Sequence, residues 1–376
     1  MKKESLGGLI LVICTIIAMA VANSSWGAAY ADILHMPLTL GVNEYIINLS
    51  LLHWINDALM AVFFFAVGME IKKEFLFGEL KTPSATLLPI VGAIGGMVVP
   101  ALIYTLCNVG TPTLSGWAIP MATDIAFSLG VISLAAPRAP RSIVVFLTAL
   151  AIVDDLGGIL VIALFYTSEL AVSYLLVGAV VFVALQLACY KKVPYLPVYI
   201  VGGLVLWYVF LRGGIHPTIA GVLLGFSLPY GKDGGLLVKT EHQVAPFSTF
   251  FIMPVFALAN AGIVVSMESF GQIVSPVGLG VLGGLFLGKP IGIFLAAFAL
   301  IKSRIVSLPQ GVRLGHFLGA GMLGGIGFTM SLFIASLAFV DATALVTAKM
   351  AILTASVASA LGGSVVFALT KDKALR

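Results

Sequence analysis

Residues 143–166 read I-V-V-F-L-T-A-L-A-I-V-D-D-L-G-G-I-L-V-I-A-L-F-Y, an apolar run with two adjacent carboxylates near its middle. A helix needs about 20 apolar residues to cross the hydrocarbon core of a bilayer. A charged side chain at the bilayer centre costs at least ~2.5–3.5 kcal/mol, so such residues are rare and mark functional sites. The run therefore predicts a transmembrane helix in which Asp154 and Asp155 are candidate functional residues.

The composition of the whole chain is that of a membrane protein. Of its 376 residues, 60% are hydrophobic and 10% are charged, whereas a soluble chain carries roughly 25% charged residues. Only a surface that faces lipid can do without a polar covering. The net charge of +4 does not indicate nucleic-acid binding, because the basic residues are scattered in ones, twos and threes. The three cysteines are isolated in apolar runs, which argues against a disulfide framework or a zinc site.

Twelve apolar runs lie between clusters of proline, glycine and charge. We therefore predict an all-α, polytopic membrane protein of twelve transmembrane helices, with residues 1–376 forming a single transmembrane domain. The eighth run is short enough to be a re-entrant segment instead, and the first could be a signal peptide. The polar stretch 229–246 is predicted to be a loop. The predicted spans are 6–22, 51–71, 85–106, 117–134, 143–166, 172–190, 195–211, 217–228, 247–265, 277–301, 317–339 and 345–369.

The positions of lysine and arginine agree with this count of spans. With the amino terminus in the cytoplasm, seventeen of the twenty basic residues fall on the inner side, where positive charge accumulates. Arg212 lies near the outer side, and Lys289 and Lys349 fall inside predicted spans. Lys349 is about one turn from the end of its helix and can reach the interface. Both termini are therefore predicted to be cytoplasmic.

Two further charges lie at the same predicted depth as the aspartate pair. Asp124 is midway along the fourth run and Lys289 midway along the tenth. Three carboxylates for one ammonium leave at least one acid without a cationic partner. Removal from water favours the neutral form of a carboxylic acid, so such an acid can exchange protons at cellular pH. The alternative is that Lys289 forms a buried ion pair that only fixes the packing.

The fourth and eleventh runs carry features that interrupt a helix. Residues 117–130 read W-A-I-P-M-A-T-D-I-A-F-S-L-G, in which a proline and a threonine disfavour a continuous helix just before Asp124. In the eleventh run, five glycines precede the stretch F-T-M-S at residues 328–331, which has little helix preference. Close helix packing through small residues is the alternative there. We predict two broken helices, each in the middle of a group of three spans.

Six motifs of the chain bear on its family. They are W-I-N-D-A-L-M from Trp54, G-M-E-I-K-K-E from Gly68, A-T-D-I-A-F from Ala122, A-I-V-D-D-L-G from Ala151, G-K-P-I-G from Gly288 and G-I-G-F-T-M-S from Gly325. On these motifs the chain resembles the NhaA sodium/proton antiporters over nearly its whole length. The two groups of three spans, about 85–166 and 277–369, are oppositely oriented, which indicates inverted repeats. Such repeats are a known feature of that family.

The resemblance also implies roles for individual residues. Asp154 and Asp155 would bind the transported cation and protons, and Lys289 would interact with Asp154. Asp124 would help to balance the charged ends of the crossing half-helices, and Thr123 is a candidate oxygen ligand beside it.

A pH-responsive region on the cytoplasmic side is implied as well. Lys73 and Ala245 depart from a bacterial representative of the family, which has arginine and histidine at these positions. The alternative is an ordinary solvated loop of charges, and His216 could likewise be a structural histidine. The residues of this predicted pH-regulation cluster are Glu70, Lys73, Glu74, Glu241 and His242.

The function that follows is exchange of cytoplasmic Na+, and of Li+, for external H+ by alternating access at the midplane carboxylates. Since a carboxylate must lose its proton to bind a metal ion, the two cargoes compete for one site. We expect electrogenic exchange, activation at alkaline pH, no cofactor and no enzymatic activity. The expected setting is a homodimer in the lipid bilayer of the bacterial inner membrane, without nucleic-acid partners.

Four other functions fit the sequence less well. Residues 283–289 fit the start of a phosphate-binding loop, but Pro290 replaces the required serine or threonine. An intramembrane aspartyl protease would need two acids on different helices, here Asp124 and Asp155, close enough to share a proton. A retinal protein would use Lys289 as its Schiff base. An exchanger of organic anions would need a positive pocket, whereas the predicted midplane carries net negative charge.

Overall fold

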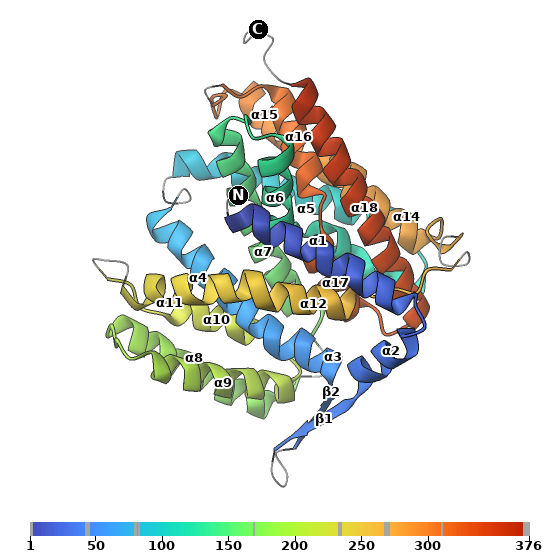
Figure 1. Ribbon diagram of the computed structural model, residues 1–376. Helices are drawn as coiled ribbons and strands as arrows, with labels where there is room; N and C mark the ends of the chain where they lie inside the picture. The colour runs from blue at the N-terminus through green and yellow to red at the C-terminus, as the bar shows by residue number, and fades with distance from the viewer. Residues whose placement is uncertain are drawn as a thin grey trace. The chain divides into compact units, whose positions relative to one another are not determined.

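The computed structural model describes residues 3–41, 46–78, 81, 83–167, 170–231, 235–266, 271–309 and 311–370, and this part of the chain is predominantly helical (Figure 1). Contacts within the chain divide it into two compact units. Unit 1 comprises Met1–Ile13, Glu79–Gly158 and Ile263–Arg376, and unit 2 comprises Cys14–Gly78 and Ile159–Gly262. Helices α1 (Lys3–Ala22) and α7 (Arg141–Phe165) each contribute to both units.

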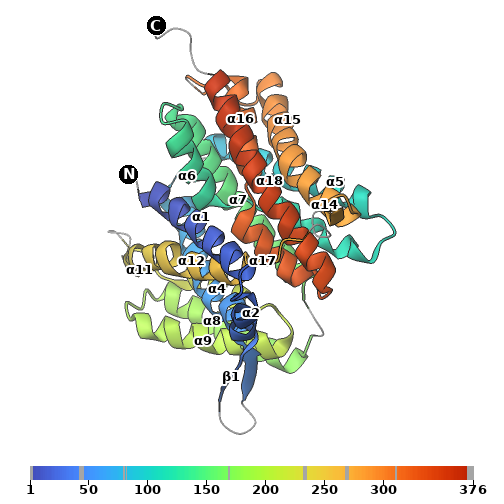
Figure 2. The same ribbon diagram turned by 45° about the vertical axis from the view of Figure 1, so that its right-hand side comes forward.

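Unit 1 contains the two interrupted helices and their neighbours. In chain order, its elements besides α1 and α7 are α5 (Pro83–Asn108), η4 (Pro112–Met121), α6 (Ile125–Ala135), α14 (Pro276–Gly283), η6 (Gly284–Gly288), α15 (Lys289–Lys302), α16 (Leu314–Gly324), α17 (Phe328–Ala338) and α18 (Ala342–Leu369). Helices α15, α16 and α18 run side by side (Figure 2). Helices α5 and α15 touch at Gly95 and Gly292, where a Cβ on either residue would lie 2.4 Å or less from the other's carbonyl oxygen. Small residues let the helix backbones approach this closely.

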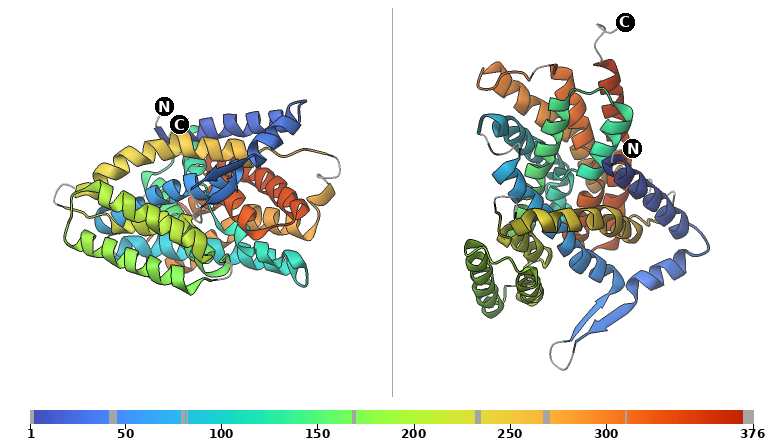
Figure 3. Two further views of the ribbon diagram at one scale, coloured as in Figure 1. Left: turned by 90° about the horizontal axis from the view of Figure 1, so that it is seen from below. Right: turned by 60° about the vertical axis from the view of Figure 1, so that its left-hand side comes forward.

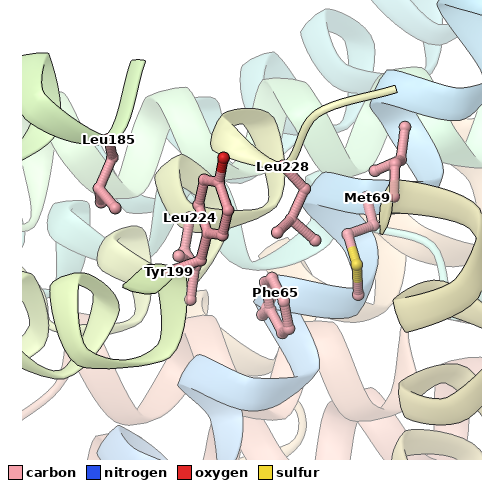
Figure 4. Packing of buried hydrophobic residues seen from close by; sticks show 7 residues of the cluster. Phe65, Met69, Leu185, Tyr199, Leu224 and Leu228 are labelled. Carbon is pink, nitrogen blue, oxygen red and sulfur yellow. The ribbon is translucent and has the colours of Figure 1, made fainter. Parts of the chain in front are cut away.

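Unit 2 is built around helix α4 and the helices that pack on it. Besides parts of α1 and α7, its elements are α2 (Gly27–His35), β1 (Pro37–Leu40), β2 (Ile47–Ser50), α3 (Leu51–Trp54), η2 (Ile55–Leu59), α4 (Met60–Phe77), α8 (Val172–Tyr190), α9 (Leu196–Gly213), α10 (Thr218–Ser227), α11 (Gly235–Phe247), η5 (Ser248–Ile252) and α12 (Met253–Asn260). Helix α10 packs tightly on α4, because a Cβ on Gly221 would meet the carbonyl oxygen of Ala61 at 2.0 Å. The packed side chains of this core are Phe65, Met69, Leu185, Tyr199, Leu224, Leu228 and Leu237 (Figure 4).

The length and apolarity of the described helices make this a multi-pass membrane protein. Eight helices are long and apolar enough to cross a membrane, and eleven spans result if each bent helix pair counts as one. The predicted eighth span, 217–228, coincides with α10, which at ten residues is shorter than a full crossing. The count of twelve therefore stays a prediction.

Both predicted interruptions are present in the structure. Helices η4 and α6 meet at a 47° bend around residues 122–124, and α16 and α17 meet at a 47° bend around residues 325–327. Proline, threonine and aspartate at the first bend, and clustered glycines at the second, lower the stability of a continuous helix there.

Two features differ from the sequence expectations. The stretch 229–246 was predicted to be a loop, but it is helical from Gly235, and α11, η5 and α12 run on as one helix to Asn260. The polarity of α11 misled the prediction, because hydropathy reports surroundings rather than backbone conformation. An antiparallel hairpin, in which β1 pairs with β2 from Pro37↔Ser50 to Leu40↔Ile47, was not foreseen (Figure 3).

Candidate ion-binding site

The two helix interruptions of unit 1 lie against each other. The Asp124 N–H donates to the Ile326 carbonyl at 2.7 Å, which joins the two bends directly. The Ser128 hydroxyl on α6 donates to the Leu323 carbonyl at 2.8 Å, and the Ser331 hydroxyl on α17 donates to the Ile119 carbonyl at 2.8 Å. Each second half-helix thus supplies a hydroxyl to the end of the other first half-helix, whose terminal carbonyls lack intrahelical donors.

Asp124 caps two half-helices with one carboxylate. Its Oδ1 accepts the Phe127 N–H at 2.9 Å, as the N-cap of α6. Its Oδ2 accepts both the N–H of Thr329, at 3.2 Å, and the hydroxyl of the same residue, at 2.5 Å, in the first turn of α17. The amino ends of helices carry partial positive charge, so a buried anion is stabilised where two of them converge. The helix-balancing role of Asp124 stays a prediction.

Lys289, Thr123 and Asp154 form a buried cluster beside this crossing. The Lys289 ammonium, which is completely inaccessible to solvent, donates to Asp154 Oδ2 at 2.5 Å and also to the Thr123 hydroxyl. The Thr123 hydroxyl lies 2.6 Å from Asp154 Oδ2 and 2.9 Å from the Gly324 carbonyl. A hydroxyl has one proton, so it can donate to only one of these two acceptors at a time.

One carboxylate oxygen of Asp154 accepts no hydrogen bond from the described residues. All the hydrogen bonds that the side chain accepts end on Oδ2, whereas the buried Oδ1 accepts none from the residues that the structure describes. A buried carboxylate oxygen without a donor is costly, and a cation or a proton would stabilise it. Asp155 is also buried, at 2% exposure, and its charge acts on Lys289.

The structure thus brings together the residues that the sequence predicted to lie at the midplane. Among the described aspartates, glutamates, lysines and arginines, four are buried, and all four lie in unit 1: Asp124, Asp154, Asp155 and Lys289. Three potential negative charges face one positive charge. Such an arrangement is suited to a cation or to protons.

Most of the predicted pH-regulation cluster also comes together, within unit 2. Lys73 on α4 forms an ion pair with Glu241 on α11, with 2.9 Å between Nζ and Oε1. Glu70 interacts electrostatically with Lys73, Glu241 and Glu74. His242 follows Glu241 but is exposed, and it makes no hydrogen bond or ion pair with described members of the cluster.

Sequence reasoning missed Lys72, the neighbour of Lys73. Its ammonium donates to the carbonyls of Phe226 and Leu228, each at 2.7 Å, and so caps the carboxyl end of α10. Two adjacent lysines on a helix point about 100° apart, which was a signal that they have different partners.

Asp57 was also missed, although it stands inside an apolar run in the motif W-I-N-D. Its Oδ1 lies 3.6 Å from Nε2 of His216, whose Nδ1 is 2.7 Å from the Thr218 hydroxyl. Burial lowers the pKa of His216 to about 4. The histidine is therefore neutral near pH 7.

A multi-pass helical protein with buried carboxylates and a lysine at the crossing of two broken helices has the features of an ion-coupled secondary transporter. Comparison with known proteins makes the class specific: the chain belongs to the Na+/H+ antiporter 1 family, whose model matches residues 1–367. It is 53% identical to Na(+)/H(+) antiporter NhaA 2 of Clostridium beijerinckii, over 98% of this chain and 92% of that protein. It is 51% identical to NhaA 1 of the same organism, over 99% and 94%. It is 45% identical to NhaA of Vibrio cholerae, over 96% and 94%.

Proposed function

We propose that this protein exchanges cytoplasmic Na+, and also Li+, for external H+ at Asp154 and Asp155. The observation that carries the proposal is the one-sided bonding of Asp154. Lys289 and Thr123 occupy Oδ2, while the buried Oδ1 is left for a cation or a proton. Sodium is a hard cation that prefers oxygen ligands, and protons compete for the same oxygens.

Thr123 and Lys289 would adjust the site as the cargo changes. A sodium ion at Asp154 weakens the attraction of that carboxylate for Lys289, since like charges repel at close range in a dry site. The Thr123 hydroxyl can then donate to the Gly324 carbonyl, 2.9 Å away, instead of to Asp154. Lys289 and Thr123 would thus couple cation binding to the helix crossing, with the Thr123 hydroxyl oxygen as a further candidate ligand of the ion.

Alternating access is the proposed mode of transport, with residues 85–166 and 277–369 as inverted repeats. The reciprocal bonds of Ser128 and Ser331 across the two bends support such a relation between the two interrupted helices. Oppositely oriented repeats that rock about a central site expose it to each side in turn. Protons moving inward down their gradient would drive sodium outward.

Electrogenic exchange and alkaline activation complete the proposal. Two adjacent carboxylates can load more than one proton per sodium ion and would titrate as a pair, so each cycle would move net charge. The cluster of Glu70, Lys73, Glu74 and Glu241, with His242 beside it, would set the active pH range from the cytoplasmic side. Cytoplasmic termini and a homodimeric assembly belong to the same proposal.

The deciding experiment is sodium-dependent recovery of a pH-dye signal in everted membrane vesicles, repeated with Li+ and at several pH values. We expect recovery with both ions, stronger at alkaline pH, and none in vesicles that contain Asp155→Asn. In liposomes, an imposed membrane potential should change the rate. Recovery that is independent of Na+ and Li+, or unaffected by Asp155→Asn, would refute the proposal.

A further inference from the structure

Immediately before Lys289, the helix α14–η6–α15 contains a turn of π-helix that leaves one carbonyl without a partner. The Lys289 N–H donates to the Gly284 carbonyl, five residues back, rather than to that of Leu285. In this register the donor for Leu285 would be the residue after Lys289, but Pro290 has no N–H. Leu285 is completely buried, the Lys289 N–H is taken by Gly284, and no described residue outside this helix donates to the Leu285 carbonyl. Buried carbonyls nearly always have a partner.

Helix α18 likewise contains a buried hydroxyl without a hydrogen-bond partner among the described residues. Thr347, Thr354 and Ser364 each donate to the carbonyl four residues earlier, at 2.7–2.8 Å, as helical hydroxyls commonly do. Ser359, which is completely buried, makes no hydrogen bond within the described part of the chain, and neither does Ser356, three residues before it. Ser359 could have been satisfied locally, so its orientation away from its own helix indicates another partner.

The Leu285 carbonyl and the Ser359 hydroxyl both lie beside Gly325, in the interruption between α16 and α17. The point that a Cβ of Gly325 would occupy is 2.4 Å from the Leu285 carbonyl oxygen, 2.7 Å from Ser359 Oγ and 3.1 Å from the Met322 carbonyl oxygen. No direct hydrogen bond joins Ser359 to Leu285. Because both oxygens lie this close to one point, they are at most about 5.1 Å apart, a separation that one water molecule beside Gly325 can bridge with two hydrogen bonds.

We propose that Leu285, Ser359 and Met322 bind one internal water molecule against Gly325. The water donates to the Leu285 carbonyl and accepts from the Ser359 hydroxyl, with its second proton directed to the Met322 carbonyl. Internal waters make about three hydrogen bonds to otherwise unsatisfied groups. All three oxygens are neutral, and Lys289 follows the same π turn, so the site suits water rather than a cation.

This water would act as a positioning element for Lys289. It supplies the hydrogen bond that the π turn lacks, and that turn sets the direction from which the ammonium reaches Asp154. Gly324, the residue before Gly325, accepts a hydrogen bond from the Thr123 hydroxyl through its carbonyl. The water site and the candidate ion site are therefore joined through consecutive residues. This role rests on the proposed function, whereas the presence of the water does not.

X-ray radiolysis with mass spectrometry tests for the water without measuring transport, because bound water converts to hydroxyl radical and oxidises adjacent side chains. We expect oxidation of Met322 and Leu285 in the folded protein, with slow incorporation of label from H2(18)O. Ser359→Ala should reduce this oxidation several-fold. Ser364→Ala, on the same helix but with its hydroxyl already bonded to Ala360, should not. Absence of oxidation in the wild type, or equal oxidation in Ser359→Ala, would overturn the site.

The positioning role has its own readout in the pH profile of exchange. Loss of the water should loosen the Lys289–Asp154 pair, so Ser359→Ala should move the half-maximal pH by several tenths of a unit, while Ser364→Ala leaves it in place. An unmoved profile in Ser359→Ala with reduced oxidation would overturn the positioning role and leave the water site established. Absence of exchange in the wild type would refute the proposed function and leave the radiolysis result unaffected.

Discussion

Replacing Asp124 with alanine should destabilise unit 1 more than the loss of any ordinary helix cap. The change removes three hydrogen bonds from a carboxylate that is 1% exposed, to the Phe127 N–H, the Thr329 N–H and the Thr329 hydroxyl. Hydrogen bonds to charged groups contribute about 1.5–3 kcal/mol each, while burial of the carboxylate opposes them. Removing one partner of a buried charged network typically costs about 3–5 kcal/mol.

For a protein of this size, each kcal/mol corresponds to about 2 °C in melting temperature, so Asp124→Ala should melt about 6–10 °C below the wild type. Asp124→Asn keeps one acceptor oxygen and should fall between the two. The assay is thermal unfolding in detergent, followed by tryptophan fluorescence. Asp341 provides the control, because this exposed N-cap of α18 accepts one hydrogen bond, from Ala344 at 2.7 Å. Asp341→Ala should cost about 1 kcal/mol. Equal melting temperatures for Asp124→Ala and Asp341→Ala would refute the shared-cap interpretation.

Four further predictions concern transport and pH. Asp155→Asn should abolish sodium-coupled proton release at every pH, whereas Asp154→Asn should retain residual exchange that no longer moves net charge; sodium flux and membrane potential in liposomes measure both, and wild-type exchange in Asp155→Asn would overturn the assignment. Lys289→Arg should retain more exchange than Lys289→Ala, because a positive charge is what Asp154 requires; equal and complete loss in two folded variants would instead favour a lysine-specific reaction. Lys73→Met should shift the pH profile by breaking the 2.9 Å pair with Glu241, without changing sodium affinity at alkaline pH, and His242→Ala should shift it less, since His242 is exposed; a changed affinity with an unmoved profile would place the cluster in the transport path. The pKa of His216 is about 4 in the folded protein and about 6.5 in the unfolded chain, so the unfolded state binds more protons between these values. The free energy of unfolding should therefore be about 2 kcal/mol lower at pH 5 than above pH 6.5. The melting temperature of His216→Gln should depend less on pH over this range.

The residues that could be predicted from the sequence are those whose free-energy cost depends only on their neighbours in the chain. A buried charge in an apolar run or a proline in a predicted helix is unfavourable wherever the chain folds, so Asp124, Lys289 and the two bends were identified directly. Which aspartate meets Lys289 depends on helix rotation and packing, and it was available only through the resemblance to a known family.

Other features depend on contacts that no local pattern records. Lys72 and Lys73 look equivalent in the sequence, yet one caps α10 and the other pairs with α11. The water-site oxygens of Leu285 and Ser359 are ordinary in composition, and their missing partners become visible only in three dimensions. The helix α11 was missed because its charged side chains resemble those of a loop.

The crossing of the two interrupted helices has a consequence for biosynthesis. Thr123 and its acceptor at Gly324 are 201 residues apart, and Asp124 and Thr329 are 205 apart. At a synthesis rate of about 5–20 residues per second, the second interrupted helix is made roughly 10–40 s after the first. During that interval the carboxylate and unpaired peptide groups of the first must be shielded by water, lipid headgroups or the insertion machinery. Nascent chains that end before the eleventh span should therefore be especially vulnerable to membrane proteases.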